Sequence, residues 1–214
     1  AGLSLLHVEA PVFAGPKLAV KTIIDRCAAA SLLIILSPLF AVLALRIRRD
    51  HEGPVFFQQE RIGKSGTSFP MLKFRTMEVG AESMLPSLLD RSDGQGPLFK
   101  LRDDPRITPV GAMLRRYSLD ELPQLVNVLR GQMSLVGPRP PLAHEVETYA
   151  NNVRRKLLVK PGMTGLWQIN GRSELCGDES VRFDLYYVEN WSVMSDLMSL
   201  WRTGRAVLRA SGAY

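Results

Sequence analysis

The sequence has little cysteine and little histidine, which limits the kinds of site that it can form. Its 214 residues include 2 cysteines and 3 histidines. Two cysteines make no disulfide framework, and this favours a reducing, cytosolic setting. His144 has no second histidine or cysteine at ligand spacing, so we interpret it as a surface residue and not as a metal ligand.

The sequence also lacks the motifs of nucleic-acid-binding proteins. It contains no zinc-finger spacing, no RNP-like motif and no helix-turn-helix signature. The formal net charge is nevertheless +6, which indicates an anionic partner. Among nucleic acid, a phosphorylated substrate and anionic lipid, nucleic acid is therefore the weakest candidate, and we expect none to bind.

Internal repeats, low-complexity tracts and a signal-peptide cleavage pattern are absent as well. A length of 214 residues suffices for one domain with a sizeable core or for two very small ones, and we predict one. The chain starts at Ala1 and not at Met, so we expect it to be part of a longer protein.

Charge is missing from one long stretch. No residue from Cys27 to Leu45 is charged, and as a helix this run would measure roughly 28 Å, close to the thickness of a bilayer's hydrocarbon core. Cations flank both of its ends: Lys17, Lys21, Arg26, Arg46, Arg48 and Arg49. Because flanking cations favour the cytoplasmic side, both ends are expected there.

The dipeptide Ser37-Pro38 lies inside this run and offers a place for the chain to turn back. Proline interrupts helical hydrogen bonding, and a serine hydroxyl can bond a carbonyl that the break sets free. We therefore predict a re-entrant pair of helices over 17–49 that dips into one leaflet. A kinked transmembrane helix and a buried core helix are the alternatives.

The remaining sequence mixes extended and helical patterns. Residues 55–77 form two extended runs around a Gly/Ser turn, which is typical of a β-hairpin. Lys73 and Arg75 then share one strand face, either as solvated cations or as a binding surface. Helices are predicted over 77–89, 110–117, 141–158 and 193–208, and the apolar face of the last is either core or in contact with lipid headgroups.

Two adjacent carboxylates, Asp120 and Glu121, stand inside the segment "RRYSLDELPQL". One interpretation is structural, because Ser118 and Glu121 have the spacing of a helix capping box and Gly131 is a suitable C-terminal stop. Pro123 fits that helix poorly, since it would occupy the fifth position. A helix that starts closer to the proline would instead leave Asp120 at an electropositive helix end, where anions bind.

A rigid arginine follows downstream, where Arg139 stands between prolines in "GPRPP". Prolines restrict the backbone, which lowers the entropy that the arginine loses when it binds a phosphate. A rigid exposed turn explains the same segment equally well.

Five motifs follow the Ser-Pro-broken helix in order: "KFRTM", "DPRIT", "SLDELPQLVNVLRGQMSLVGPRP", "KPGMTGLWQINGR" and "FDLYYVENWS". Over about residues 17–208 the chain closely resembles the bacterial sugar transferases, monotopic polyprenyl-phosphate phosphoglycosyltransferases that start exopolysaccharide, O-antigen and glycoprotein glycan assembly. Residues 1–16 resemble the linker of longer members, in which transmembrane helices and a regulatory domain come first.

The resemblance implies an α+β fold, in which a small mixed catalytic body over 50–214 contains the β-hairpin. The re-entrant helix over 17–49 and interfacial helices would anchor this body on the cytoplasmic face of the bacterial inner membrane. UDP-sugar, polyprenyl phosphate and membrane lipids are the implied partners. The identity of the sugar is left open, as is homodimerisation.

The resemblance also implies a covalent mechanism that requires Mg²⁺. Asp120 is the implied nucleophile, which would attack the β-phosphorus of a UDP-sugar, expel UMP and hold the sugar phosphate until polyprenyl phosphate takes it. Asp120 and Glu121 are the implied metal ligands, and Glu121 could also assist proton transfer. The two rival functions are a non-catalytic module that binds anionic lipid and a glycosyltransferase that releases UDP.

Further site residues come from the basic and acidic positions of the motifs. The cations expected to bind substrate phosphates and nucleotide are Lys73, Arg75, Arg115, Arg139 and Arg172. Asp184 and Asp196 match acidic positions of the family only loosely. Pro109 stands where many members have a basic residue, which is a departure from the family pattern.

Overall fold

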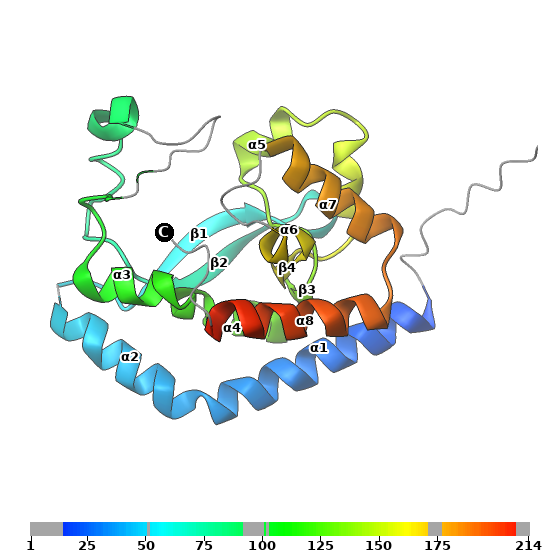
Figure 1. The fold of residues 1–214 in the computed structure, drawn as a ribbon, viewed down its shortest axis with the longest axis horizontal. Coiled ribbons are helices and arrows are strands. Elements are labelled where there is room, and N and C mark those ends of the chain that lie inside the picture. Colours follow the sequence, from blue (N-terminus) through cyan, green and yellow to red (C-terminus); the bar gives the residue numbers. More distant parts are fainter. Residues whose placement is uncertain (1–14, 51, 92–100, 102, 171–176, 209–214) are drawn as a thin grey trace, which may run out of the picture.

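The computed structural model describes residues 15–50, 52–91, 101, 103–170 and 177–208. Helices α1 (Pro16–Ile35) and α2 (Ser37–Asp50) form a shallow V along one side of the molecule, and the rest of the described chain lies on its inner side (Figure 1). Helix α4 (Gln124–Arg130) packs on α1, and α3 (Pro109–Arg116) packs on α2.

Two small sheets form within the described residues. Strands β1 (Phe56–Ile62) and β2 (Ser68–Phe74) are antiparallel, as the predicted hairpin requires. Strands β3 (Ser134–Val136) and β4 (Gly162–Thr164) are parallel and pair in a separate sheet. The mixture of helices with these short sheets agrees with the predicted α+β class.

The V bends at Leu36, between the two helices. Its arms differ in direction by 63°, and the Ser37 hydroxyl donates a hydrogen bond of 2.8 Å to the Ile34 carbonyl, as predicted from the sequence. Pro38 lies in the first turn of α2, where proline is tolerated. No single described helix is long and apolar enough to cross a membrane, whereas the bent pair has the length and composition when taken together.

Two clusters of buried apolar side chains join the V to the rest of the fold. The first lies among α1, β2, α4 and β3 and contains Ala29, Phe69, Met71, Leu125, Val128, Met133, Leu135, Val136 and Tyr187. The second joins α2, β2 and α3 and contains Leu43, Ile47, Phe74 and Leu114. The hairpin strand β2 therefore contributes to both clusters and is held firmly against the inner side of the V.

The V also exposes large apolar side chains that neither cluster covers. On the two arms these are Val20, Ile23, Ile24, Leu32, Ile34, Ile35, Val42 and Leu45. Ile34 and Ile35, next to the bend, are 74% and 70% exposed. An apolar surface of this extent on a water-soluble monomer would be unusual, and it marks a contact with lipid or protein.

Helix α8 (Val193–Leu208) has its polar side toward the protein and its apolar side toward the outside. Ser199 is buried, and the Thr203 hydroxyl bonds that of Thr164 on β4 at 2.7 Å. The exposed side chains are instead Val193, Met194, Leu197, Met198, Leu200 and Trp201. Of the two interpretations of this helix, the one that placed its apolar face in the core is wrong.

Two predicted helices are also wrong. Residues 77–89 do not form one helix, because Met77 pairs with Ile107 in a β-bridge and Gly80 adopts a left-handed φ of 82° before the short 3₁₀ helix η2 (Pro86–Arg91). Residues 141–158 break into α5 (Ala143–Glu147) and the 3₁₀ helix η4 (Val153–Leu158). Asn151 and Asn152 stand between the two, and asparagine favours turns over helix interiors.

The predicted helix over 110–117 is confirmed as α3, and its position depends on a glycine. A Cβ on Gly111 would lie 2.0 Å from the Thr76 carbonyl oxygen, so only glycine allows α3 to approach the end of β2 this closely. Thr108 caps the helix by accepting a hydrogen bond of 2.9 Å from the Gly111 N–H. This contact brings the C-terminal arginines of α3 toward the acidic turn that follows.

Candidate active site

The two adjacent carboxylates lie on a 3₁₀ turn, η3 (Leu119–Glu121), between α3 and α4. Ser118 adopts a left-handed conformation with a φ of 54° and makes no capping hydrogen bond with its side chain, so the capping-box interpretation is wrong. Helix α4 begins only after Pro123, as the alternative predicted. It ends at Arg130, and Gly131 is the C-terminal stop that the first interpretation expected. Neither carboxylate is therefore committed to capping a helix.

Lys73, on strand β2, joins the two carboxylates. Its ammonium nitrogen lies 2.8 Å from Glu121 Oε1 and 3.9 Å from Asp120 Oδ2. Asp120 is 9% exposed, whereas Glu121 is more accessible. The arrangement brings together a buried carboxylate, a partly exposed one and the cation that both attract.

Burial raises the pKa of Asp120 to about 6, and the neighbouring Glu121 contributes to the rise, while Lys73 and Arg115 oppose it. Burial disfavours the charged form of Lys73 too, but the attraction of Glu121 and Asp120 outweighs it and raises the pKa of Lys73. At neutral pH Asp120 is therefore ionised, and the nearby cations compensate its negative charge only in part. Lys73 remains positively charged beside it.

Arg115 approaches the dyad from α3. Its Nε donates a hydrogen bond of 2.9 Å to the Thr76 hydroxyl, just past the end of β2. Burial lowers the pKa of Arg115, and Asp120 opposes that effect electrostatically. Arg115 thus adds a second positive charge near the buried carboxylate, as expected from the sequence.

Two further arginines lie close together beside the dyad. Arg139 is held by Glu145, 3.2 Å from its Nη1, and its guanidinium lies 6.0 Å from the centre of the Trp167 ring. Arg61, on β1, donates a hydrogen bond of 3.0 Å to the Pro140 carbonyl. Burial and the nearby Arg139 lower the pKa of Arg61 to about 10, and Glu145 and Glu121 oppose this.

Sequence reasoning missed Arg61, although a signal was present. The hairpin register pairs Arg61 with Phe69 and Phe57 with Lys73, so Arg61 and Lys73 project from the same face. A register derived from the turn at 63–67 would have identified this shared face. Arg61 is thus a fourth cation of the site, besides Lys73, Arg115 and Arg139.

The structure places the remaining predicted cations differently. Arg75 lies one residue past β2, and its guanidinium is beside Gly53. Its Nε is buried, and no hydrogen-bond partner for it exists in the part of the chain that the structure describes. Arg172 lies outside the described residues.

The two loosely matched acidic residues have structural partners. Asp184 Oδ2 lies 3.2 Å from the Lys156 ammonium, and its Oδ1 accepts a hydrogen bond of 3.3 Å from the Arg139 backbone N–H. Asp184 thereby fixes the loop that carries Arg139. Asp196 instead pairs with Lys21 on α1 at 2.6 Å and accepts a hydrogen bond from the Trp191 indole, which joins α8 to the V.

The dyad offers a pair of carboxylate ligands that a metal ion could share with ligands from outside the protein. Mg²⁺ typically binds one or two carboxylates together with substrate phosphate oxygens and waters, and Asp120 and Glu121 provide that carboxylate pair. In the described part of the chain no cluster of three histidine, cysteine, aspartate or glutamate side chains could hold a metal. The donor set therefore fits Mg²⁺ whose remaining ligands are phosphate oxygens and water.

Residues 16–210 match the family model described as bacterial sugar transferase. The chain belongs to the bacterial sugar transferase family. Membership confirms the resemblance that the five ordered motifs indicated.

Several curated members of the family are similar over most of the chain. The undecaprenyl-phosphate galactose phosphotransferase of Salmonella typhimurium is 45% identical over 199 residues, which are 91% of this chain and 41% of that protein. Exopolysaccharide production protein ExoY of Rhizobium meliloti is 42% identical over 198 residues, 91% of this chain and 88% of that protein.

A third relative is the UDP-glucose:undecaprenyl-phosphate glucose-1-phosphate transferase of Caulobacter vibrioides, which is 38% identical over 212 residues. The match covers 93% of this chain and 74% of that protein. The chain spans less than half the length of the Salmonella protein and of a galactosyl transferase from Streptococcus agalactiae.

The raised pKa of Asp120 predicts a pH-dependent effect of Asp120→Asn on stability. The pKa of Asp120 in the folded protein, about 6, exceeds its ordinary value of 3.8, so ionisation of Asp120 lowers the free energy of unfolding. This loss of stability grows between pH 3.8 and about 6 and is constant at higher pH. Asp120→Asn should therefore raise the melting temperature at pH 8 and have little effect at pH 3.5. Thermal unfolding across this pH range measures the difference.

The matched control is Asp103→Asn, because Asp103 is exposed and should change the melting temperature little at either pH. A melting temperature for Asp120→Asn that is lower than wild type at pH 8 would mean that Lys73 and Arg115 fully compensate the charge. That outcome would contradict the assignment of a poorly stabilised carboxylate.

Proposed function

We propose that this chain is a phosphoglycosyltransferase that moves a sugar-1-phosphate from a UDP-sugar to undecaprenyl phosphate. The observation that carries the proposal is the buried Asp120 carboxylate, whose pKa is raised to about 6, beside Lys73 and Glu121. Relatives named for undecaprenyl-phosphate galactose and glucose-1-phosphate transfer support the substrate class.

In the first step, Asp120 Oδ attacks the β-phosphorus of the UDP-sugar. The bond from that phosphorus to the oxygen that bridges the α-phosphate breaks, and UMP leaves with the electron pair. The sugar-1-phosphoryl group remains on Asp120 as an acyl phosphate. A carboxylate with incomplete charge compensation is a better nucleophile than an ordinary surface aspartate, which fits the environment of Asp120.

The surrounding cations make this attack feasible. An anionic nucleophile and an anionic diphosphate repel each other, so the site must neutralise charge before they can approach. Lys73 and Arg115 flank the carboxylate, while Arg61 and Arg139 lie together on the neighbouring side. We assign the first pair to the reacting β-phosphate and the second pair to the rest of the nucleotide diphosphate.

In the second step, a phosphate oxygen of undecaprenyl phosphate attacks the same phosphorus and expels the Asp120 carboxylate. The product is a polyprenyl diphosphate sugar, and the enzyme returns to its initial state. Glu121 is accessible enough to accept a proton from the incoming phosphate. Mg²⁺ held by Asp120, Glu121 and the diphosphate would supply further neutralisation of phosphate charge.

The exposed apolar surfaces support a location at the membrane. We propose that α1 and α2 enter one leaflet as a re-entrant pair and that the apolar face of α8 rests at the same interface. This position brings a cytosolic nucleotide sugar and a lipid phosphate to one site. Of the six cations that flank the pair of helices, all but Lys21 are exposed, and each exposed cation is worth about 1 kcal/mol near an anionic surface. A transmembrane span would carry the cations of one flank across.

Asp120→Asn is expected to lower turnover by more than about a thousandfold, because it removes the nucleophile's charge and leaves its shape. The assay measures nucleotide release from UDP-galactose and UDP-glucose with undecaprenyl phosphate and Mg²⁺. Asp103→Asn, on the exposed surface, should keep wild-type turnover.

The identity of the released nucleotide separates this proposal from its rivals. UMP supports sugar-phosphate transfer, UDP would indicate a glycosyltransferase that moves only the sugar, and no release with either substrate would favour a non-catalytic lipid-binding module. Retention of wild-type turnover by folded Asp120→Asn would exclude Asp120 as the nucleophile.

The re-entrant geometry predicts that the start of α1 and the end of α2 both lie on the cytoplasmic side. Single cysteines at Lys17 and Arg48, both exposed, should be protected from a membrane-impermeant thiol reagent in intact cells and labelled after permeabilisation. The background carries Cys27→Ser and Cys176→Ser. Lys21 is a poor reporter, because Asp196 binds its side chain.

A straightening variant is the matched control for this topology. Replacing Pro38 with Leu should favour one continuous helix and increase labelling of one arm from outside. Labelling of either cysteine in intact cells with the unaltered Ser37-Pro38 break would show a transmembrane span and contradict the re-entrant pair.

A further inference from the structure

Helix α7 (Gly177–Glu189) holds the segment that leads to Arg139 at two points. The Tyr187 hydroxyl donates a hydrogen bond of 2.9 Å to the Val136 carbonyl, at the end of β3. Asp184 Oδ1 accepts a hydrogen bond of 3.3 Å from the Arg139 backbone N–H. Tyr187 and Asp184 are three residues apart and both buried, so they project from the same inward face of α7. This face therefore fixes both ends of the segment 136–139.

The backbone between these two points is stiff. Gly162 on β4 donates a hydrogen bond of 2.8 Å to the Pro138 carbonyl. A Cβ on Gly162 would collide with the Gly137 nitrogen, so the two glycines pack backbone against backbone. Pro138 restricts the segment further. A shift of Val136 is therefore passed on to Arg139 instead of being absorbed between them.

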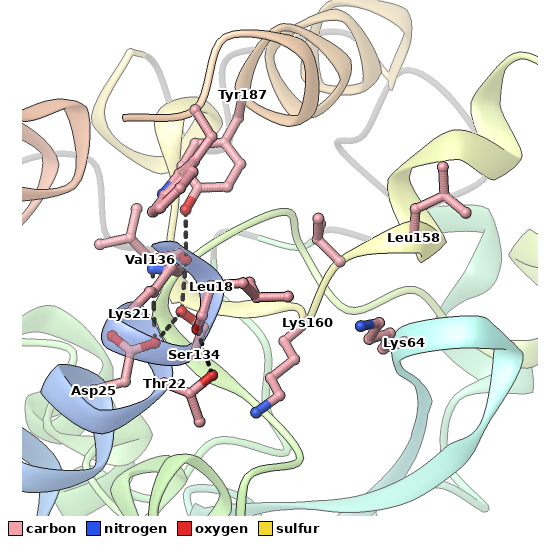
Figure 2. Close-up of a pocket in the computed structure, with 12 residues that line it drawn as sticks. Leu18, Lys21, Thr22, Asp25, Lys64, Ser134, Val136, Leu158, Lys160 and Tyr187 are labelled. Carbon is pink, nitrogen blue, oxygen red and sulfur yellow. Dashed lines mark hydrogen bonds and ion pairs between the residues drawn. The ribbon is translucent and has the colours of Figure 1, made fainter. Parts of the chain in front are cut away.

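The Val136 carbonyl also belongs to a buried network that reaches α1. Figure 2 shows Tyr187 directed toward Val136, with Ser134, Asp25 and Lys21 gathered below it. The Ser134 hydroxyl lies 2.9 Å from the Val136 carbonyl and 2.6 Å from Asp25 Oδ2. Because Asp25 belongs to α1, this helix is linked to the end of β3 through Ser134.

Helix α8 enters the same network through Asp196. Its Oδ1 lies 2.8 Å from the Tyr187 hydroxyl, and its Oδ2 lies 2.6 Å from the Lys21 ammonium. The Lys21 ammonium also lies 3.6 Å from Asp25, one turn farther along α1. Both helices that we place at the membrane are thus connected to the backbone that carries Arg139.

The network has fewer hydroxyl protons than acceptors for them. Tyr187 and Ser134 each carry one hydroxyl proton. Three acceptors lie within hydrogen-bond distance of these hydroxyls: Asp25 Oδ2, Asp196 Oδ1 and the Val136 carbonyl. Lys21 neutralises part of the charge of both carboxylates, which weakens their competition for the two protons. The ion pairs of Lys21 therefore favour the hydrogen bonds to Val136.

We propose that Tyr187 and Ser134 are positioning residues for Arg139, and that Lys21 keeps their hydroxyl protons available to the Val136 carbonyl. The inference rests on the proposed function, in which Arg139 binds the diphosphate of the UDP-sugar. Tyr187 is 4% exposed and Ser134 is 1% exposed, so neither touches the substrate. Their effect on nucleotide binding passes through the segment 136–139.

Calorimetric titration of the purified protein in detergent with UDP tests this role. Tyr187→Phe keeps the ring and removes the hydroxyl, and it should weaken UDP binding about fivefold, the effect of one hydrogen bond. Arg139→Gln should weaken binding about tenfold or more, because it removes a charged contact with phosphate. Adding Tyr187→Phe to Arg139→Gln should then weaken binding less than about twofold further, since Tyr187 acts through Arg139.

Two further variants test the rest of the network and serve if Tyr187→Phe does not fold. Ser134→Ala removes the other hydroxyl, and Lys21→Met leaves the two carboxylates to compete for the hydroxyl protons. Each should weaken UDP binding in the wild-type background, with little additional loss in the Arg139→Gln background. Melting temperatures identify the folded variants, and the KM for UDP-galactose or UDP-glucose should rise with the loss of UDP affinity.

The matched control is Glu189→Gln, on the same helix α7. It removes an exposed ion pair with Arg155, 2.9 Å long, and should change the UDP affinity less than about twofold. Unchanged UDP affinity in folded Tyr187→Phe, additive weakening in the double variant, or an equal loss in Glu189→Gln would overturn the proposal. Absence of UDP binding to wild type would contradict the proposed function and this inference with it.

Discussion

The attraction between Lys73 and the Asp120–Glu121 pair is the interaction on which the site depends. Two adjacent carboxylates on one turn repel each other, and burial of Asp120 adds a desolvation cost. Lys73 opposes both effects from strand β2, which the two apolar clusters hold against the V. The compensation is incomplete, since the pKa of Asp120 is still raised to about 6. That residual instability is what an incoming cation, or a bond to phosphorus, would relieve.

The same packing relates the site to the exposed apolar surface. Strand β2 carries Lys73 and contacts both arms of the V through its buried side chains. Helix α3 reaches the end of β2 because Gly111 has no side chain, and it brings Arg115 to the dyad. Helix α8 turns its polar side inward and its apolar side outward. The packed fold thus presents a charged site suited to phosphates together with exposed surfaces suited to lipid.

Local patterns in the sequence predicted a large part of this arrangement. The hairpin, α3, the break at Ser37 and the start of α4 after Pro123 follow from turn residues and proline positions, which act over a few residues. The helices expected over 77–89 and 141–158 fail because tertiary pairing and asparagine turns outweigh weak helical patterns. Arg61 could have been found from the hairpin register, which places it on the same strand face as Lys73. The partners of Asp184 depend on contacts between distant segments, which spacing along the chain does not reveal.

The covalent intermediate is the central claim, and intact-protein mass spectrometry tests it most directly. The protein is incubated with UDP-galactose or UDP-glucose and Mg²⁺ without undecaprenyl phosphate, and the reaction is stopped rapidly with acid. The account predicts a mass increase of one sugar phosphate that maps to Asp120, is absent in Asp120→Asn and disappears when undecaprenyl phosphate is added. Unmodified protein under conditions that give UMP once the lipid is present would contradict it and indicate direct transfer between the two substrates.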